Sequence, residues 1–203
     1  RLSFSGRARA MTSADQEEAS SPFLRRRRLL AALAALGLGG TLLWLARPQG
    51  DPAAHAALSR LIYAKLQEPD GTPRRIATDW RERVRIVNFW ATWCPPCRAE
   101  LPLLAAASQA WPEEKVQFLG LALDDKEAVR RYLERTPLPY PVLLAPPALL
   151  DLTVPLGNRR RVLPFTLVID PHEEQVAAQV GPVTRAKLDG WIHAALTDDA
   201  ASR

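Results

Sequence analysis

The chain has 203 residues, of which 47% are hydrophobic, and this is enough for one packed domain with appendages but tight for two. Its net charge of +5 comes from residues 1–50, which carry eight basic and three acidic residues, whereas residues 51–203 are neutral overall. A nucleic-acid-binding domain would need a basic patch on its folded part. The charge distribution therefore argues against nucleic acid as a partner.

An apolar segment close to the N-terminus predicts a membrane anchor. Residues 29–46 form an uncharged run of 18 residues, which as a helix of about 27 Å just crosses a bilayer core. Four arginines at 25–28 precede the run, so the positive-inside rule predicts a cytoplasmic tail over 1–28 and export of everything after 46. The alternative is a cleaved signal peptide ending near AHA at 54–56, and the arginines also loosely fit a twin-arginine signal. We expect the uncleaved anchor, because the run exceeds the roughly 7–15 residues usual in signal peptides.

The composition of the remaining segments predicts one exported domain between an N-terminal linker and a short C-terminal tail. Residues 1–10 precede Met11, the only methionine, so translation from Met11 would leave them outside the protein. Residues 47–57 are rich in Pro, Gly and Ala and predict a linker. We expect the folded domain over 58–197 and a C-terminal tail over 198–203.

The domain pattern predicts an α/β fold. Segment 63–76 indicates a β-hairpin around Asp70-Gly71, although apolar residues at helical spacing make 58–66 a helix in an alternative interpretation. Strands that alternate with helices pair in parallel, and a short turn at Pro171-His172 predicts an antiparallel pair near the end. We therefore expect a mixed central sheet flanked by helices. The further elements expected are a strand at 84–91, a helix at 98–111 in which only Pro102 interrupts the good helix formers, a strand at 116–124, a helix at 125–135, a short extended piece and a short helix within 140–158, strands at 165–170 and 174–181, and a helix at 184–196.

The only two cysteines, Cys94 and Cys97, are separated by two prolines. A structural zinc site normally needs four Cys or His ligands, and the three histidines show no ligand spacing to this pair. A purely structural disulfide would close a loop of two intervening residues and would stabilise the fold little. The pattern favours a reversible redox dithiol at a strand-to-helix junction.

The expected local structure assigns different tasks to the two sulfurs. The strand at 84–91 would deliver Cys94 to the start of a helix, where free N–H groups and the helix dipole favour a thiolate nucleophile. Cys97, three residues later on the same face, can attack the mixed disulfide as the resolving thiol. Pro95 and Pro96 fit the first helical turn, although they remove two donors that could have stabilised the Cys94 thiolate.

A family resemblance lies in the segment NFWATWCPPCRAELP, with Pro102 five positions after the second cysteine, in the segment VLPFTLVID and in the N-terminal apolar span. Through these features the chain resembles the membrane-anchored TlpA/ResA/CcmG-type thioredoxin-like proteins over about residues 60–196. The resemblance implies a thioredoxin-like fold and a thiol–disulfide oxidoreductase without a cofactor, held by one span in the bacterial inner membrane with its domain in the periplasm. It implies a reductant of disulfides in exported proteins, apocytochrome c among them, that receives electrons from a transmembrane thiol carrier. We expect a monomer.

The same resemblance extends to individual positions. Pro164 matches the cis-proline that faces the active site, a plain trans proline at a strand start being the alternative. Glu100 matches an acidic residue of the reductive members and could exchange a proton with a buried thiol, although an acid in a first helical turn needs no such role. Asn88 stands where cytosolic thioredoxins carry a buried aspartate, so that proton route is absent. We expect Trp93 to frame the site and Trp90 to be a buried strand aromatic. The predicted catalytic residues are Cys94, Cys97, Glu100 and Pro164.

Three other functions remain alternatives on this fold. A disulfide oxidase or isomerase would use the same chemistry at a different potential, and the lack of a large helical insertion argues mildly against the common oxidase architecture. A copper metallochaperone would need a His or Met near the cysteines, but Met11 lies on the other side of the predicted anchor. A peroxidase is disfavoured because there is no separate peroxidatic cysteine. The family's insertion region corresponds to 136–161, which ends in three arginines.

Overall fold

The computed structural model describes residues 51–201, with side chains described as far as residue 197. The predicted cytoplasmic tail over 1–28 and the predicted anchor over 29–46 lie outside the described residues. Among the helices within 51–201, none has both the length and the apolar character that crossing a membrane requires.

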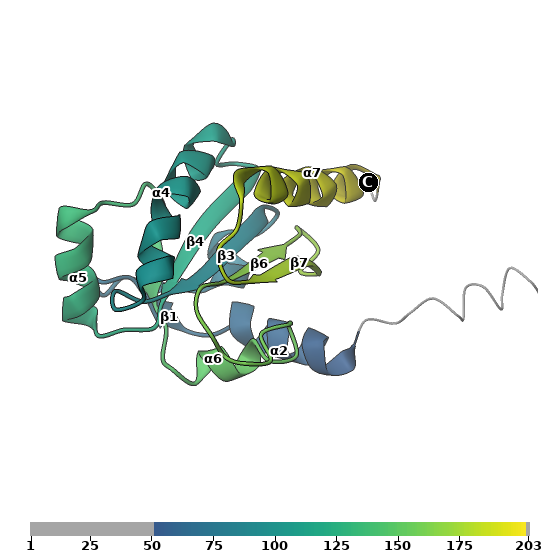
Figure 1. The fold of residues 1–203 in the computed structure, drawn as a ribbon. Helices are drawn as coiled ribbons and strands as arrows, with labels where there is room; N and C mark the ends of the chain where they lie inside the picture. The colour runs from purple at the N-terminus through teal and green to yellow at the C-terminus, as the bar shows by residue number, and fades with distance from the viewer. Residues whose placement is uncertain (1–50, 202–203) are drawn as a thin grey trace, which may run out of the picture. The chain divides into compact units, whose positions relative to one another are not determined.

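The described chain forms a seven-stranded mixed sheet with the strand order β2–β1–β5–β4–β3–β6–β7 (Figure 1). The three neighbours β5, β4 and β3 run parallel, whereas the outer strands on both sides pair antiparallel. The mixed sheet expected from the sequence is therefore confirmed. The strand bounds are β1 Leu66–Gln67, β2 Pro73–Arg74, β3 Val84–Trp90, β4 Val116–Ala122, β5 Val142–Leu144, β6 Phe165–Ile169 and β7 Gln175–Val180.

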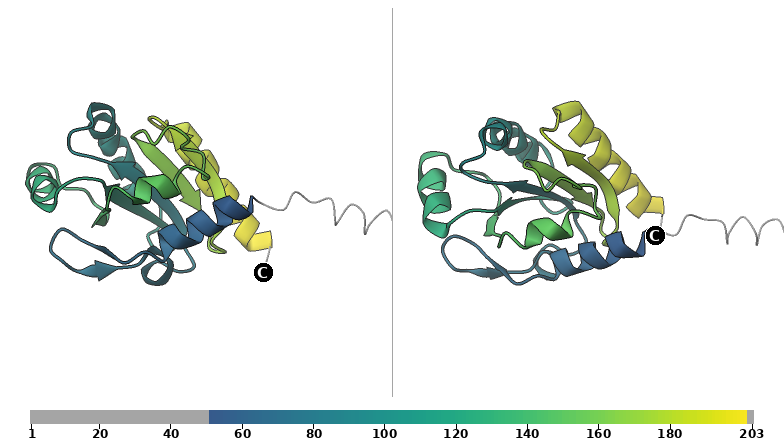
Figure 2. Two further views of the ribbon diagram at one scale, coloured as in Figure 1. Left: turned by 90° about the horizontal axis from the view of Figure 1, so that it is seen from below. Right: turned by 60° about the horizontal axis from the view of Figure 1, so that its bottom comes forward.

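Helices cover both faces of the sheet, α4 and α7 on one side and α2 and α6 on the other (Figure 2). Every residue of the central strands β3 and β4 is buried, which explains why apolar residues occupy both faces of each strand and do not alternate with polar ones, although Arg85, Asn88 and Gln117 are also buried there. The helix bounds are α2 Pro52–Ile62, α3 Ile76–Asp79, α4 Pro95–Ala110, α5 Lys126–Arg135, α6 Leu149–Leu152 and α7 Arg185–Ala201.

The N-terminal part of the domain corrects the predicted linker. Residues 52–57 are helical, because α2 begins at Pro52 with Asp51 as its N-cap, whose side chain accepts a hydrogen bond from the Ala53 N–H at 2.9 Å. Leu61 and its apolar neighbours at helical spacing pack into the core. The two alternatives for this region both describe part of it, since the helix ends at Ile62 and the hairpin follows.

The predicted hairpin around Asp70-Gly71 is confirmed, although its strands are only two residues long. Gly71 has a φ of 100°, which only glycine adopts readily, and the Asp70 side chain accepts a hydrogen bond from the Thr72 N–H. The short helix α3 that follows was not predicted from the sequence, because a single turn leaves no periodic pattern to recognise.

Two helices extend in ways that the sequence leaves open or contradicts. Helix α4 runs through Pro102 and loses only the backbone hydrogen bond that a proline cannot donate. Burial of Leu101 and Leu104 against the sheet holds the helix together across this position. At the C-terminus, α7 continues to Ala201, so residues 198–201 extend the last helix instead of forming a tail.

Candidate active site

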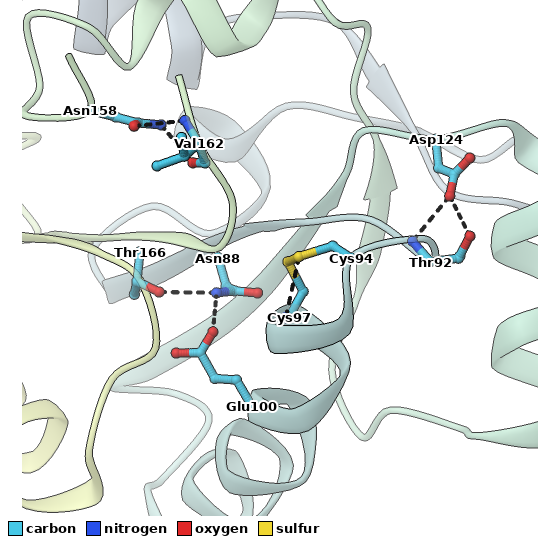
Figure 3. Close-up of a disulfide and its surroundings, with 9 residues drawn as sticks. All are labelled: Asn88, Thr92, Cys94, Cys97, Glu100, Asp124, Asn158, Val162 and Thr166. Carbon is cyan, nitrogen blue, oxygen red and sulfur yellow. Dashed lines mark hydrogen bonds between the residues drawn. A yellow bond between two sulfur atoms is a disulfide. The ribbon is translucent and has the colours of Figure 1, made fainter. Parts of the chain in front are cut away.

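The two cysteines lie where the end of β3 passes into α4, and they form a disulfide (Figure 3). Cys94 is the N-cap of α4, Pro95 and Pro96 occupy its first turn, and the Cys97 N–H donates to the Cys94 Sγ at 3.3 Å. Cys94 retains 4% exposure and Cys97 none, so a partner reaches Cys94 first. A zinc site would need more ligands, and within residues 51–201 no three His, Cys, Asp or Glu side chains are grouped to hold a metal.

The surface beside the disulfide is apolar. Trp93, directly before Cys94, is 65% exposed and is one of four large hydrophobic residues that the described surface displays. Trp90, in contrast, is fully buried and contacts the Tyr132 ring at a tilt of 56°, with ring centroids 5.2 Å apart. The site therefore presents one exposed aromatic next to the accessible sulfur, as an apolar contact for a partner chain.

The loop that leads into Cys94 is held by a contact that the sequence did not reveal. The Thr92 N–H donates to the Asp124 carboxylate at 3.0 Å, and the Thr92 hydroxyl donates to the same oxygen (Figure 3). Asp124 comes just after β4, the parallel neighbour of β3, so both segments leave the sheet at the same edge. An acid immediately after a buried parallel strand is the signal that could have identified this position.

A buried polar cluster lies on the inner side of the disulfide. Glu100, only 4% exposed, accepts a hydrogen bond from the Val183 N–H at 2.6 Å and another from the Asn88 side-chain amide at 3.2 Å. The same amide nitrogen of Asn88 donates to the Thr166 hydroxyl at 3.0 Å. Strands β3 and β6, helix α4 and the segment before α7 thus meet in one network, and the predicted residues Asn88 and Glu100 are neighbours.

Burial raises the pKa of Glu100 above its ordinary value of 4.5, and the hydrogen bonds from Val183 and Asn88 offset part of this effect. A carboxyl group with a raised pKa exchanges protons more readily near neutral pH than an exposed carboxyl group with an ordinary pKa. Figure 3 places the Asn88 side chain between the Glu100 carboxyl group and the disulfide. The direct proton exchange predicted for Glu100 would therefore need either a movement or an intervening molecule.

The raised pKa of Glu100 predicts a pH dependence of stability. Above pH 4.5 the Glu100 carboxyl group of the unfolded chain loses its proton, while that of the native protein keeps it up to its raised pKa. The contribution of Glu100 to the free energy of unfolding is therefore complete below pH 4.5 and is lost as the pH rises through the pKa of the native protein. The free energy of unfolding of the wild type should consequently fall, relative to that of Glu100→Gln, as the pH rises from 4.5. Urea unfolding of both proteins over this range measures the difference, and parallel curves would contradict the prediction.

Pro164 lies at the end of the strands where β3 leads to the cysteines. Its peptide bond with Leu163 is cis, as the resemblance implied, and the residue is buried. Phe165 pairs with Phe89 in the β3–β6 ladder, so Pro164 is one residue beyond the last pair, beside the end of β3. The topology thus brings Pro164 and the C-x-x-C segment to the same end of the sheet, and its catalytic role stays a prediction.

The loop before Pro164 is fixed by a second contact that the sequence did not reveal. Asn158 is fully buried, and its side chain both accepts from the Val162 N–H and donates to the Val162 carbonyl oxygen, each at 3.0 Å (Figure 3). Arg159, Arg160 and Arg161 form the exposed turn between these two residues. The arginines of the predicted insertion region are therefore the solvent-exposed part of the loop 158–162, which the hydrogen bonds between Asn158 and Val162 hold in place.

Comparison with known proteins agrees with this geometry. Residues 61–188 match the AhpC/TSA family. A thiol-disulfide oxidoreductase ResA of Bacillus cereus (strain ZK / E33L) is 29% identical over 107 residues, which are 52% of this chain and 60% of that protein. The chain therefore spans less than two thirds of this curated relative.

Two solved structures are covered almost completely. A thiol:disulfide interchange protein of the thioredoxin family from Chlorobium tepidum TLS is 30% identical, with a TM-score of 0.57 over 68% of this chain and 97% of that chain. A thioredoxin-related protein from Neisseria meningitidis serogroup B is 32% identical, with a TM-score of 0.57 over 66% of this chain and 99% of that chain. The chain belongs to the AhpC/TSA family and, with these structural relatives, to the thioredoxin family.

Proposed function

We propose that the protein is a thiol–disulfide oxidoreductase that reduces disulfides in partner proteins. The observation that carries this proposal is the Cys94–Cys97 disulfide at the N-terminus of α4, with the less buried sulfur next to the exposed Trp93. The printed names of the relatives from Bacillus cereus and Chlorobium tepidum describe the same class of reaction.

The reaction follows from the different positions of the two sulfurs. In the reduced protein the Cys94 thiolate attacks a partner disulfide, forms a mixed disulfide and releases one partner thiolate. The Cys97 thiolate then attacks the Cys94 sulfur, the Cys94–Cys97 bond forms, and the second partner sulfur leaves. Two electrons pass to the partner, and a dithiol donor returns them by the reverse sequence. Each released partner thiolate takes a proton from the solvent, and the Cys97 thiol gives up its own proton when it attacks.

The direction of electron flow and the location are part of the proposal. The apolar run at 29–46 behind four arginines supports an inner-membrane anchor with the domain in the periplasm. A transmembrane thiol carrier would then supply electrons, and exported proteins with disulfides, apocytochrome c among them, would receive them. We propose that the protein acts as a monomer and needs no cofactor, since the two sulfurs hold both electrons.

The reduction potential of the full-length chain tests the direction. A reductant should equilibrate with dithiol buffers well below about −120 mV, the potential of the strongest dithiol oxidants of this fold. A measured value close to that figure would instead support the oxidase alternative, which uses the same two sulfurs.

Trapping identifies the partner. Cys97→Ala lacks the resolving thiol, so its mixed disulfides on Cys94 should persist in membranes of the native cell and be recovered by mass spectrometry after acid quenching. The matched control, Cys94→Ala with Cys97→Ala, should recover none of them. Trapped apocytochromes would support a role in cytochrome c maturation, whereas recovery without any specific adduct would contradict that role.

A further inference from the structure

The side-chain oxygen of Asn88 is buried and has no hydrogen-bond partner within the part of the chain that the structure describes. Asn88 itself is only 2% exposed, so bulk water does not reach this oxygen. A buried acceptor left unpaired is costly in a folded protein and calls for an explanation. Figure 3 shows this oxygen directed towards the Cys94–Cys97 disulfide, while the amide nitrogen points away from it.

The orientation of the Asn88 amide is determined by its other neighbours. Its nitrogen donates to the Glu100 carboxylate at 3.2 Å and to the Thr166 hydroxyl at 3.0 Å, which uses both of its N–H bonds. When Glu100 is ionised, its carboxylate only accepts hydrogen bonds, so a rotated Asn88 amide would set two oxygens against each other. At a pH where Glu100 is ionised, the network therefore holds the Asn88 oxygen on the side of the sulfurs.

A disulfide has no hydrogen to donate, but a thiol has one. Asn88 is on the same face of β3 as Ile86 and Trp90, and this face packs against the buried side of α4 to which Cys97 belongs. Cys97 is fully buried, so its thiol must find an acceptor inside the protein. We propose that Asn88 is a positioning residue that accepts a hydrogen bond from the Cys97 thiol in the reduced protein and so favours the dithiol over the disulfide.

The proposal concerns an equilibrium whose atoms and electrons balance. A small-molecule dithiol gives two electrons and two protons to the Cys94–Cys97 bond, becomes a cyclic disulfide, and leaves two thiols on the protein. Only the product state contains the S–H group of Cys97 that Asn88 can bind. The inference rests on the dithiol exchange proposed above, but not on the identity or direction of the physiological partner.

The redox equilibrium of the full-length chain with dithiothreitol tests the inference. Asn88→Leu has a similar side-chain volume and lacks the acceptor, so it should be about threefold to tenfold harder to reduce, as expected for the loss of one net hydrogen bond. The ratio of reduced to oxidised dithiothreitol at half-reduction should rise by that factor. An unchanged or lower ratio would overturn the proposal.

A further protein separates this role from a structural one. Thr166→Val removes an acceptor of the same amide nitrogen but leaves the oxygen in place, so it should leave the midpoint ratio unchanged. A rise in Thr166→Val equal to that in Asn88→Leu would contradict the proposal.

A spectroscopic measurement on a protein that keeps Asn88, Glu100 and Thr166 observes the hydrogen bond itself. In Cys94→Ser the only thiol is Cys97, and its infrared S–H stretching band should lie at the lower frequency typical of a donating thiol. The band should move up in Cys94→Ser with Asn88→Ala. A Cys97 band at the frequency of a free thiol would overturn the inference, while trapping on Cys97→Ala would still test the proposed function.

Discussion

Replacement of Cys94 by serine should lower the rate of disulfide reduction to the uncatalysed background. A serine hydroxyl is not a nucleophile towards sulfur at neutral pH, because only a thiolate attacks a disulfide at a useful rate. Cys97 cannot take over, since it is fully buried in the first turn of α4, on the side that faces Asn88. The rate at which the reduced protein cleaves a disulfide-linked peptide, followed by the released thiols, measures the effect.

The matched control for this result is Cys97→Ser, which removes the other sulfur of the same pair. It should still attack the peptide once, giving one mixed disulfide on Cys94 for each protein molecule, and then stop. Measurable turnover by Cys94→Ser would show that Cys97 can act as the first nucleophile. In that case the assignment of roles by burial and by position at the start of α4 would be wrong.

The parts of the site that were predictable are those that a short stretch of chain encodes. The run Val84–Trp90 is a buried strand, Pro95 and Pro96 suit a first helical turn, and so the placement of Cys94 at a helix N-terminus followed from local sequence. The hairpin around Asp70-Gly71 has equally local causes. In each case the residues that determine the structure are neighbours along the chain.

The parts that were not predictable join segments distant in the sequence. Glu100 was predicted because it matches an acidic residue of the family that the sequence resembles, but its partner Val183, which contributes a backbone N–H, carries no side-chain signal at all. The contact of Thr92 with Asp124 depends on the alignment of two parallel strands. Polar residues such as these have no periodicity, so a pattern of apolar positions cannot locate them.

The linker prediction failed for a different physical reason. Residues 52–57 contain proline and alanines, a composition that suits both a flexible linker and a capped helix start. Packing of Leu58 and Leu61 against the sheet decided in favour of the helix. Local composition alone left this choice open, because the stabilising contacts come from residues far along the chain.

Replacement of Asn158 by alanine should destabilise the protein by about 1–3 kcal/mol, because the N–H and the carbonyl group of Val162 both lose their hydrogen bond to the buried Asn158 side chain. The loop 158–162 leads through Leu163 into Pro164, a predicted catalytic residue, so the rate of disulfide exchange should fall as well. Urea unfolding of the oxidised wild type and variant gives the change in free energy, and the peptide assay gives the change in rate.

Two variants of the same loop make this result specific. Asn158→Asp keeps the acceptor for the Val162 N–H but sets a buried, acceptor-only carboxylate against the Val162 carbonyl oxygen, so it should destabilise the protein at least as much as alanine. Arg160→Ala alters an exposed side chain of the turn and should change stability by no more than about 0.5 kcal/mol. If Asn158→Ala has the same free energy of unfolding as the wild type, the two hydrogen bonds do not hold the loop 158–162. The position of Pro164 beside the cysteines would then depend on the β3–β6 ladder alone.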